Sequence, residues 1–568
     1  MLVAKLRAAG SLSEADKKTK TPPSDACECY DGVTPMNRRR MLNKCAALAA
    51  APFFPWAAAG ENRLLAEEPS RRPAPDFRTD APKLQSKWDA ALAGLAGNIG
   101  HVYRFPGPVL KEGAIYSGVW LESAPQEGLL YAPFNPAVAV NNHRVFFDLQ
   151  RADGYLPYSV RSNGAGASQI QMVVPVAATA LELAERLHDD DLLARAYRAC
   201  SAWDRWLVRY RNTRGTGLCE LFCGYDTGED NSARFKGLPW KCPHDDARIC
   251  PQVGALPYLA PDLSATVYGG RVALAAMAGR LGKNGEAAGW EEQAESIRRA
   301  VMKWCFDAAD ACFYDRDSHD QFVRIRCVEL LVVLGEHLVD RRLFEEIYRR
   351  HIRNPKEFWT PYPFPSVAAD DPLFNHDLPP NCWGGPSQVL TALRAPRWME
   401  HYGKAADLAH LMRRWIQALT ASEGFQQQVN PWTGKFSTGS AYSPAMLLLT
   451  DFVARLYGVV EEGGALQWNC RLPEGARRSR YQLSTSHGTA ELSLQSAKGK
   501  PSGELTLAGK NRLAVTGAVR VVTGLDGTPL SLLGTEPGSV DVVLTWPDGH
   551  SARHTVPADK RVSIQPPR

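Results

Sequence analysis

Apolar residues return every three to four positions along most of the chain between residues 84 and 458. The clearest stretches are 173–189, 191–211, 262–282 and 285–306. This spacing places the apolar side chains on one face of a helix. Short polar or glycine links join the stretches, so sequence neighbours should run antiparallel as hairpins.

Weaker helical patterns complete the region and bring the expected number of helices to about eleven. They lie at 84–97, 135–152, 321–337, 340–353, 385–402, 403–421 and 441–458. Three long loops rich in Trp, Pro, Gly and Asp interrupt them, at 212–261, 354–384 and 422–440. Loops of this length in a compact domain usually hold a binding site. We therefore predict an all-α (α/α)6 toroid over residues 83–460, with a pocket at its mouth. A helical solenoid is the alternative, although no fixed repeat is visible.

The pattern changes after Gly458, where the helical period gives way to short alternating runs. From residue 463 these include "YQLSTS", "AELSLQS" and "VDVVLTW", separated by Gly, Pro and Asp. Alternation of this kind predicts strands. We expect a small all-β sandwich at 463–568, acting as an accessory domain, and a Pro/Arg-rich linker at 60–82.

The first 59 residues indicate a targeting segment. From Met36, a plausible true start, an Arg38–Arg40 cluster precedes a short apolar stretch and the small residues Ala57–Ala59. This order is similar to a twin-arginine export signal, and the apolar stretch is too short to span a bilayer. We expect a periplasmic or secreted protein without a membrane span. A buried N-terminal helix is the alternative.

Charge and cysteine content bear on two questions, whether the chain binds nucleic acid and whether its cysteines bind a metal. Lys and Arg number 66 against 61 Asp and Glu, and the surplus is spread along the chain, which argues against a nucleic-acid partner. Cys219, Cys223, Cys242 and Cys250 lie close in sequence. Their spacing is a poor match to zinc sites, so one or two loop-stapling disulfides are favoured over a metal.

Candidate chemistry concentrates in "GYDTGEDNSARF", residues 224–235, which holds Asp226, Glu229, Asp230 and Arg234. Three carboxylates so close should raise the pKa of one toward the value a general acid needs, while Arg234 keeps another ionised. An oxygen-rich turn of this kind could instead cap a helix or bind calcium. Apart from a possible structural calcium ion, no cofactor is expected.

The segment "TGEDNSARF" resembles the acid motif of trehalase-like and glycoside hydrolase family 63-like (mannosylglycerate-hydrolase-like) six-hairpin glycosidases. Four further stretches agree in order: "PDLSATVYGGRVALAAMA" with Asp262, "CFYDRD" (312–317), "FWTPYPFPSVAADDP" (358–372) and "NCWGGPSQ" (381–388). The resemblance covers about residues 100–458. It implies an (α/α)6 fold, inverting hydrolysis of a glycoside, Asp230 as general acid, and Asn231 and Arg234 in the sugar subsite.

One position departs from that family. Its general base is a Glu shortly before the last helix, and "FQQQVNPWTGKF" has Gln427 there. An amide holds water but accepts no proton at neutral pH. Three readings follow: a base elsewhere, lyase or epimerase chemistry, or a pocket that only binds glycan. Candidate bases are Asp226, Glu229, Glu423, Asp370 and Asp371, and candidate residues for lyase or epimerase chemistry are His143, Tyr155, Tyr158, His376 and Tyr442.

Aromatic residues in the loops favour a carbohydrate partner, because flat rings stack on the C–H face of a sugar. The candidates are Trp240, Trp359, Trp383 and Trp432, with Tyr158 as a further substrate-binding residue. The sequence as a whole predicts an exported glycoside hydrolase, exo-acting on an oligosaccharide or glycoconjugate.

Overall fold

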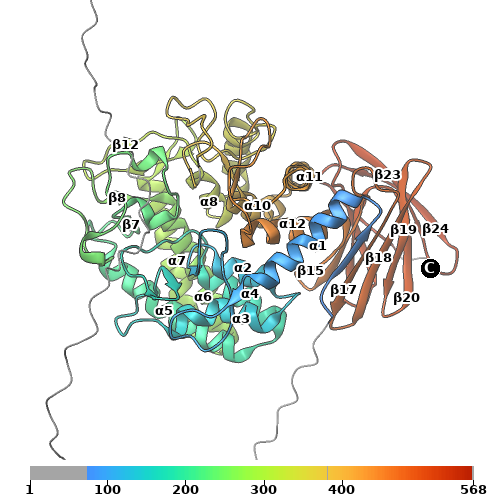
Figure 1. Cartoon of the computed structure of the whole chain (residues 1–568), viewed down its shortest axis with the longest axis horizontal. Helices are drawn as coiled ribbons and strands as arrows, with labels where there is room; N and C mark the ends of the chain where they lie inside the picture. Colours follow the sequence, from blue (N-terminus) through green and yellow to red (C-terminus); the bar gives the residue numbers. More distant parts are fainter. Residues whose placement is uncertain (1–72, 380, 566–568) are drawn as a thin grey trace, which may run out of the picture. The chain divides into compact units, whose positions relative to one another are not determined.

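The computed structural model describes residues 73–379 and 381–565 (Figure 1). The α-helices in this part are α1 (Pro82–Gly97), α2 (Ala124–Tyr131), α3 (Pro136–Asp148), α4 (Val176–Leu187), α5 (Asp190–Tyr210), α6 (Pro261–Arg280), α7 (Asn284–Trp304), α8 (Glu329–Gly335), α9 (Arg341–Ile347), α10 (Val389–His401), α11 (Ala405–Ala421) and α12 (Ser443–Tyr457). The predicted export signal lies outside the described residues. No described helix combines the length and apolar character needed to cross a bilayer.

Alternate helices are neighbours in space. Helix α2 contacts α4, α4 contacts α6, α6 contacts α8, α8 contacts α10, α10 contacts α12, and α12 returns to α2. The even-numbered helices therefore form a closed ring. Helices α3, α5, α7 and α11 each pack against the ring helix that precedes them.

The sequence explains where the helices begin and which of their faces are buried. Helix α5 starts where the Asp189 side chain accepts a hydrogen bond from the N–H of Leu192 at 2.8 Å, and acidic residues fill its first turn. Its buried residues lie on one face, as expected of a helix with one solvent side. Helices α6 and α12 are buried on nearly all sides, which fits ring helices covered by neighbours.

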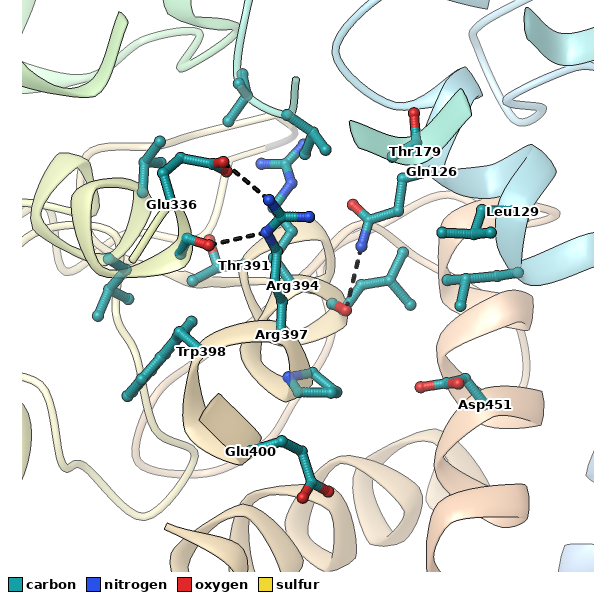
Figure 2. Close-up of a pocket in the computed structure, with 18 of the residues that line it drawn as sticks. Gln126, Leu129, Thr179, Glu336, Thr391, Arg394, Arg397, Trp398, Glu400 and Asp451 are labelled. Carbon is teal, nitrogen blue, oxygen red and sulfur yellow. Dashed lines mark hydrogen bonds and ion pairs between the residues drawn. The ribbon is translucent and has the colours of Figure 1, made fainter. Parts of the chain in front are cut away.

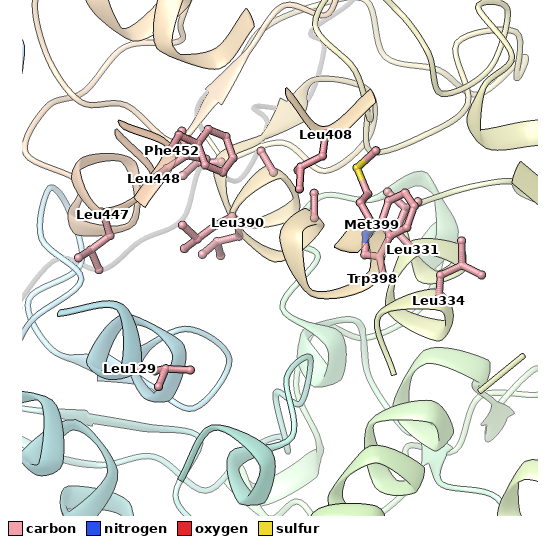
Figure 3. Packing of buried hydrophobic residues seen from close by; sticks show 14 of the residues in the cluster. Leu129, Leu331, Leu334, Leu390, Trp398, Met399, Leu408, Leu447, Leu448 and Phe452 are labelled. Atoms are coloured by element: carbon pink, nitrogen blue, oxygen red, sulfur yellow. The ribbon is translucent and has the colours of Figure 1, made fainter. Parts of the chain in front are cut away.

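The core of the helical part lies where ring helices meet. Figure 3 shows leucines of α8, α10 and α12 packed with Trp398 and Met399 of α10 and Phe452 of α12. Trp398 and Met399 are almost fully buried. Close packing of this kind fixes the spacing of the helices and hence of the loops that leave their ends.

The prediction of an all-α domain was wrong. Short strands lie between the helices: β2 (Ile99–Gly100), β3 (Val109–Leu110), β4 (Val119–Trp120), β5 (Ser159–Arg161), β6 (Gly164–Ala165), β7 (Glu220–Leu221), β8 (Tyr258–Leu259), β9 (Phe306–Asp307), β10 (Cys312–Phe313), β11 (Asp315–Arg316), β12 (Phe322–Val323), β13 (Ser387–Gln388) and β14 (Gln428–Val429). Four of them form a sheet in the order β12-β11-β8-β7, and β13 pairs with β14. The long loops are thus fastened to one another by backbone hydrogen bonds. Strands of two residues leave no alternating pattern in the sequence.

The C-terminal part consists of two antiparallel sheets. Its strands are β15 (Val459–Glu462), β16 (Ala465–Cys470), β17 (Arg478–Thr485), β18 (Gly488–Ala497), β19 (Lys500–Leu507), β20 (Lys510–Thr516), β21 (Val519–Gly524), β22 (Pro529–Leu533), β23 (Ser539–Thr545), β24 (Ser551–Pro557) and β25 (Arg561–Ser563). Together with β1 (Asp76–Thr79), they form sheets with the orders β1-β17-β18-β19-β20-β23-β24 and β15-β16-β21-β22-β25. The chain as a whole therefore combines helices with several sheets, the largest described one having seven strands.

The first strand, β1 (Asp76–Thr79), corrects the predicted linker. It pairs with β17, opposing Phe77 to Tyr481 (Figure 1). Phe77 is fully buried and packs edge-on against Trp88 of α1. Residues 76–79 therefore belong to the folded β-sheet and are not a free connection between domains.

Candidate active site

The acidic segment begins with a single turn of 3-10 helix at Gly224–Thr227, which is held in place by Asp226. Arg211 at the end of α5 donates to Asp226 Oδ2 at 2.5 Å, and both side chains are fully buried. The same carboxylate accepts the backbone N–H groups of Ile170, Phe222 and Cys223. Asp226 therefore fastens the loop and has no oxygen available for substrate.

Arg234 is the second fastening point. Its guanidinium makes paired bonds to Asp262 of α6 at 2.6 and 2.9 Å and to Asp315 of β11 at 2.6 and 2.7 Å. It also lies 3.4 Å from Glu229. Arg234 is 3% exposed, and its guanidinium N–H groups are bonded to carboxylates. It therefore does not face a sugar, contrary to the prediction.

Replacement of Arg234 should destabilise the protein strongly. Arg234→Met keeps the side-chain volume but leaves Asp262 and Asp315 as unpaired buried carboxylates, at a cost of about 3–5 kcal/mol in unfolding free energy. Urea unfolding followed by circular dichroism measures this loss. Arg248→Met removes ion pairs of an exposed arginine with Asp246 and Asp153 and should leave the midpoint nearly unchanged. Equal midpoints for the two variants would refute the fastening role of Arg234.

Gly228 brings a further carboxylate against the loop. Its φ is +73°, a left-handed conformation that favours glycine, and a Cβ built there would lie 1.6 Å from Glu122 Oε2. The Glu122 carboxylate thus occupies the space that a side chain at residue 228 would need. This contact holds the turn immediately before Glu229 and Asp230.

Asp230 is partly exposed and, unlike Asp226 and Glu229, forms no ion pair with any residue that the structure describes. Asn381 Nδ2 donates to its Oδ2 at 2.6 Å, and its backbone oxygen accepts the N–H of Trp383 at 2.9 Å. Burial raises the pKa of Asp230 to about 6, against a smaller lowering by the Asn381 hydrogen bond. The prediction that Asp226 and Glu229 would cause such a shift was wrong in its reason, because the charge of Asp226 is balanced by Arg211 and burial, by raising the pKa of Glu229 to about 8, favours its uncharged form.

Asn381 also connects Asp230 to the position where the base was expected. Gln427 Nε2 donates to Asn381 Oδ1 at 2.8 Å, and Tyr116 donates its hydroxyl to Gln427 Oε1 at 3.0 Å. One amide group bridges the two side chains, so the Asp230 carboxylate and the Gln427 amide lie at most about 8 Å apart. Inverting glycosidases separate their acid and base by roughly 6.5–9.5 Å. This upper bound is compatible with the position of a base, but the amide of Gln427 has the wrong chemistry for one.

Other carboxylates near Asp230 are unsuited to accept a proton. Glu112 and Glu122 are buried, and burial raises their pKa well above the usual range. The negative charge of Asp230 raises both further. Burial also raises the pKa of Glu127 to about 8. Burial thus favours the protonated form of all three groups, and a protonated carboxyl is not a base.

The structure does not place any of the five carboxylates predicted as alternative bases beside Asp230 in a position to act as the base. Asp226 is bound to Arg211, and Glu229 is buried with its pKa raised to about 8 by burial. Glu423 is exposed, Asp370 is exposed and pairs with Arg326 at 3.0 Å, and Asp371 bonds the N–H of Leu373. No described contact joins any of the last three to Asp230.

The residues considered for lyase or epimerase chemistry have structural partners. The His143 ring is fully buried between Ala139 and Thr179, and burial lowers its pKa to about 4. Tyr155 donates to the backbone oxygen of Gln169, and Tyr442 donates to Glu112 at 2.9 Å. Tyr158 is buried, whereas His376 is exposed and stacks on Trp432. These side chains do not form one site.

The predicted aromatic residues divide into buried or half-buried ones and one that is exposed. Trp359 is 8% exposed and packs on His410 of α11, and Trp240 packs on Tyr225 and Phe235. Trp383 is buried next to Asp230. Trp432 is 41% exposed and forms a ring cluster with Phe374 and His376. Asn231 is exposed and donates to the backbone oxygen of Asn381 at 2.8 Å. Trp432 and Asn231 are therefore the accessible members of the predicted subsite.

Sequence reasoning missed two residues of the site, Asn381 and Tyr116. Asn381 opens the stretch "NCWGGPSQ", which the family resemblance had already marked without giving the amide a role. Tyr116 is half-buried and packs edge-on against Trp120 at 5.4 Å. It lies in an unremarkable loop, 311 residues from Gln427, and nothing in the sequence pairs the two.

A cavity of about 340 Å³ opens inside the ring, lined by side chains of α2, α4, α8, α10 and α12 (Figure 2). Glu229, Trp383 and Arg394 line it, but Asp230 does not. Figure 2 shows Gln126 and Arg394 facing the space, and Arg397 bonded to Glu336. The chamber thus lies behind the acid loop, and the Asp230 carboxylate points to Asn381.

Asp226, Glu229 and Asp230 bond to different partners, so these three carboxylates do not converge on a common point. Among the described residues, Cys223, Asp226 and Cys242 form one group whose ligating atoms lie within 4.8 Å of one another. All ten described cysteines are free thiols in the structure, so the predicted disulfides are not formed in it.

The comparisons with known proteins agree with the resemblance seen in the sequence. The family model of the mannosylglycerate hydrolase MGH1-like glycoside hydrolase domain matches residues 116–443. Family 63 mannosylglycerate hydrolase from Thermus thermophilus, solved with glucose, is 20% identical at a TM-score of 0.53, over 64% of this chain and 99% of that chain. A family 78 rhamnosidase from a Bacillus species is 11% identical at a TM-score of 0.53, over 76% of this chain and 41% of that chain.

These structural likenesses show a shared fold. A comparison with curated protein sequences finds no match. The family model nevertheless spans more than half of the chain, so the predicted resemblance to mannosylglycerate-hydrolase-like glycosidases is confirmed. The chain belongs to the MGH1-like glycoside hydrolase family and is a glycosidase.

Proposed function

We propose that this glycosidase is exo-acting, with Asp230 as general acid and Gln427 in the place of a general base. The observation that carries the proposal is the hydrogen-bonded series Asp230–Asn381–Gln427–Tyr116. It joins an acid with a raised pKa to an amide through one bridging side chain, and the resulting upper bound of about 8 Å on their separation is compatible with inverting enzymes. Because Asp230 is only partly exposed, the end of a glycan chain reaches it more easily than the middle.

In this mechanism the protonated Asp230 donates its proton to the departing glycosidic oxygen. Gln427 orients the attacking water through a free lone pair of Oε1, while Tyr116 holds the same oxygen in place. The water must lose its proton to solvent or to another water, since the amide does not take it. We therefore propose slow hydrolysis, without a cofactor, on an oligosaccharide or glycoconjugate.

The proposed acid sets the pH dependence. A general acid works in its protonated form, so kcat/KM should be level below pH 6 and fall about tenfold per unit above it, following the pKa of Asp230. Asn381 bonds the ionised carboxylate and lowers that pKa, so Asn381→Leu should move the descending limb to higher pH. Initial rates between pH 4 and 9 measure both.

The matched control is Asn375→Leu, in the same loop. Its side chain bonds Cys382 and has no described contact with Asp230. The descending limb of the pH profile of kcat/KM should stay at the same pH in this variant. The assignment of the descending limb to Asp230 would be contradicted if the limb did not move in Asn381→Leu, or if it moved equally in both variants.

One experiment tests the reaction class. The protein is incubated with mannosylglycerate, trehalose and a panel of oligosaccharides and aryl glycosides, and the products are read by mass and ultraviolet absorbance. Addition of one water with release of single sugars supports the proposal. An absorbing unsaturated product without added water indicates a lyase, and a product of unchanged mass with altered stereochemistry indicates an epimerase; either result would overturn it.

Export to the periplasm or medium is part of the same proposal. It rests on the signal-like segment ending near Ala59. Fractionation of expressing cells tests it, because replacement of Arg38 and Arg39 by Lys should retain the protein in the cytoplasm. Unchanged export of that variant would contradict a twin-arginine route.

A further inference from the structure

Two cysteines bracket the segment that carries Asp230. Cys223 directly precedes the turn at Gly224–Thr227, and Cys242 lies nineteen positions further along. Backbone bonds from Gly224 to Pro239 and from Tyr225 to Trp240 draw the two ends of this segment together. The Cys223 and Cys242 sulfurs are 3.8 Å apart, and both side chains are buried.

Metal binding is the first explanation to consider for this pair, since Asp226 completes a group of three possible ligands. The remaining contacts argue against it. Arg211 Nη2 lies 3.7 Å from Cys242 Sγ, and the guanidinium bonds both oxygens of Asp226. A divalent cation at this point would face a fixed positive charge and compete for a carboxylate that is already satisfied.

Disulfide formation meets neither obstacle. It consumes only the two sulfurs, leaves the Arg211–Asp226 pair intact, and requires an approach of less than 2 Å to reach a bond of about 2.05 Å. Cys250 packs at the edge of the same cluster, but the direct contact between sulfurs is the one that joins Cys223 and Cys242.

We infer that Cys223 and Cys242 are a disulfide-forming pair that closes the loop around Asp230. In the reaction, each thiol gives up one proton and one electron, and an S–S bond forms between them. A disulfide oxidant such as oxidised glutathione takes up both electrons and both protons as its own S–S bond breaks into two thiols, through a mixed disulfide.

Burial controls when this exchange takes place. It raises the pKa of the Cys223 thiol well above its ordinary value, so the reactive thiolate is scarce in the folded protein. Oxidation should therefore be slow on the native protein and fast during refolding. Once formed, the bond should resist dithiothreitol until the protein is unfolded.

Peptide mapping of the full chain tests the pairing. The protein is refolded with oxidised and reduced glutathione, alkylated with iodoacetamide, digested without reduction, and analysed by mass spectrometry. The expected result is one peptide pair linking Cys223 to Cys242, with Cys219 and Cys250 alkylated. Alkylation of both Cys223 and Cys242, or linkage of either to another cysteine, would overturn the inference.

Thermal unfolding provides a second readout. Closing a loop of this length should raise the midpoint of the oxidised protein by about 3 °C over the reduced one. Cys242→Ser should abolish the difference, and Cys200→Ser, a buried thiol of α5, should keep it. If Cys242→Ser does not fold, the peptide map of the unaltered chain decides alone. Stoichiometric zinc that protects both thiols from alkylation would show a metal site and refute the pairing.

Discussion

Asp230→Asn should lower kcat for glycosides with poor leaving groups by about 10²–10⁴-fold, the range attributed to a general acid. The substituted amide keeps the size of the carboxyl group but has no transferable proton at neutral pH. The oxygen of the substituted amide can still accept the hydrogen bond from Asn381 Nδ2. Substrate binding should therefore be largely retained, and KM or a measured Kd should change far less than kcat.

Asp370→Asn is the matched control for this result. The Asp370 carboxylate is exposed, bonds Arg326 and has no described contact with Asp230, so its loss should leave kcat nearly unchanged. If Asp230→Asn retained the rate of the unaltered enzyme, or if it lowered only the affinity, Asp230 would not be the acid.

Gln427→Glu should raise the rate of hydrolysis by about 10²-fold or more, since a positioned general base contributes 10²–10⁴-fold. The new carboxylate would keep the hydrogen bond from Tyr116 and lie at most about 8 Å from Asp230, an upper bound compatible with two groups that act from opposite faces of a sugar. The measurement is the initial rate on the best substrate of the glycan panel, with product stereochemistry followed by nuclear magnetic resonance.

Gln426→Glu is the control, because it adds the same charge one residue away, on a side chain that bonds Ser422. It should not increase the rate. Sodium azide should accelerate the unaltered enzyme, since an anionic nucleophile needs no base, but should have little effect on Gln427→Glu. A Gln427→Glu variant no faster than the unaltered enzyme would show that proton removal takes place elsewhere.

The helices were predictable because their apolar faces repeat over many turns. The stretches 191–211 and 262–282 are found as α5 and α6 with shifts of one or two residues at the ends. The short strands were not predictable, because two-residue strands such as β13 and β14 have no periodicity. They exist only because distant loops pair. Likewise, Phe77 gives no hint in the linker sequence that it packs on Tyr481, about four hundred residues away.

The candidate site was only partly predictable. A motif identified Asp230 and Gln427, but not the neighbours that determine their chemistry. Arg234 looked available for a sugar because its partners, Asp262 and Asp315, are 28 and 81 residues away in the sequence. The raised pKa of Asp230 comes from burial, which the spacing of acidic residues does not show.

The dependence of rate on the leaving group tests most directly whether Asp230 gives its proton to the departing sugar. A series of aryl glycosides with leaving-group pKa values from about 4 to 10 is compared for the unaltered enzyme and Asp230→Asn. We expect the logarithm of kcat/KM to fall steeply with leaving-group pKa in Asp230→Asn, and much less in the unaltered enzyme, with similar rates for the most acidic leaving groups. Equal slopes in the two proteins would contradict the account.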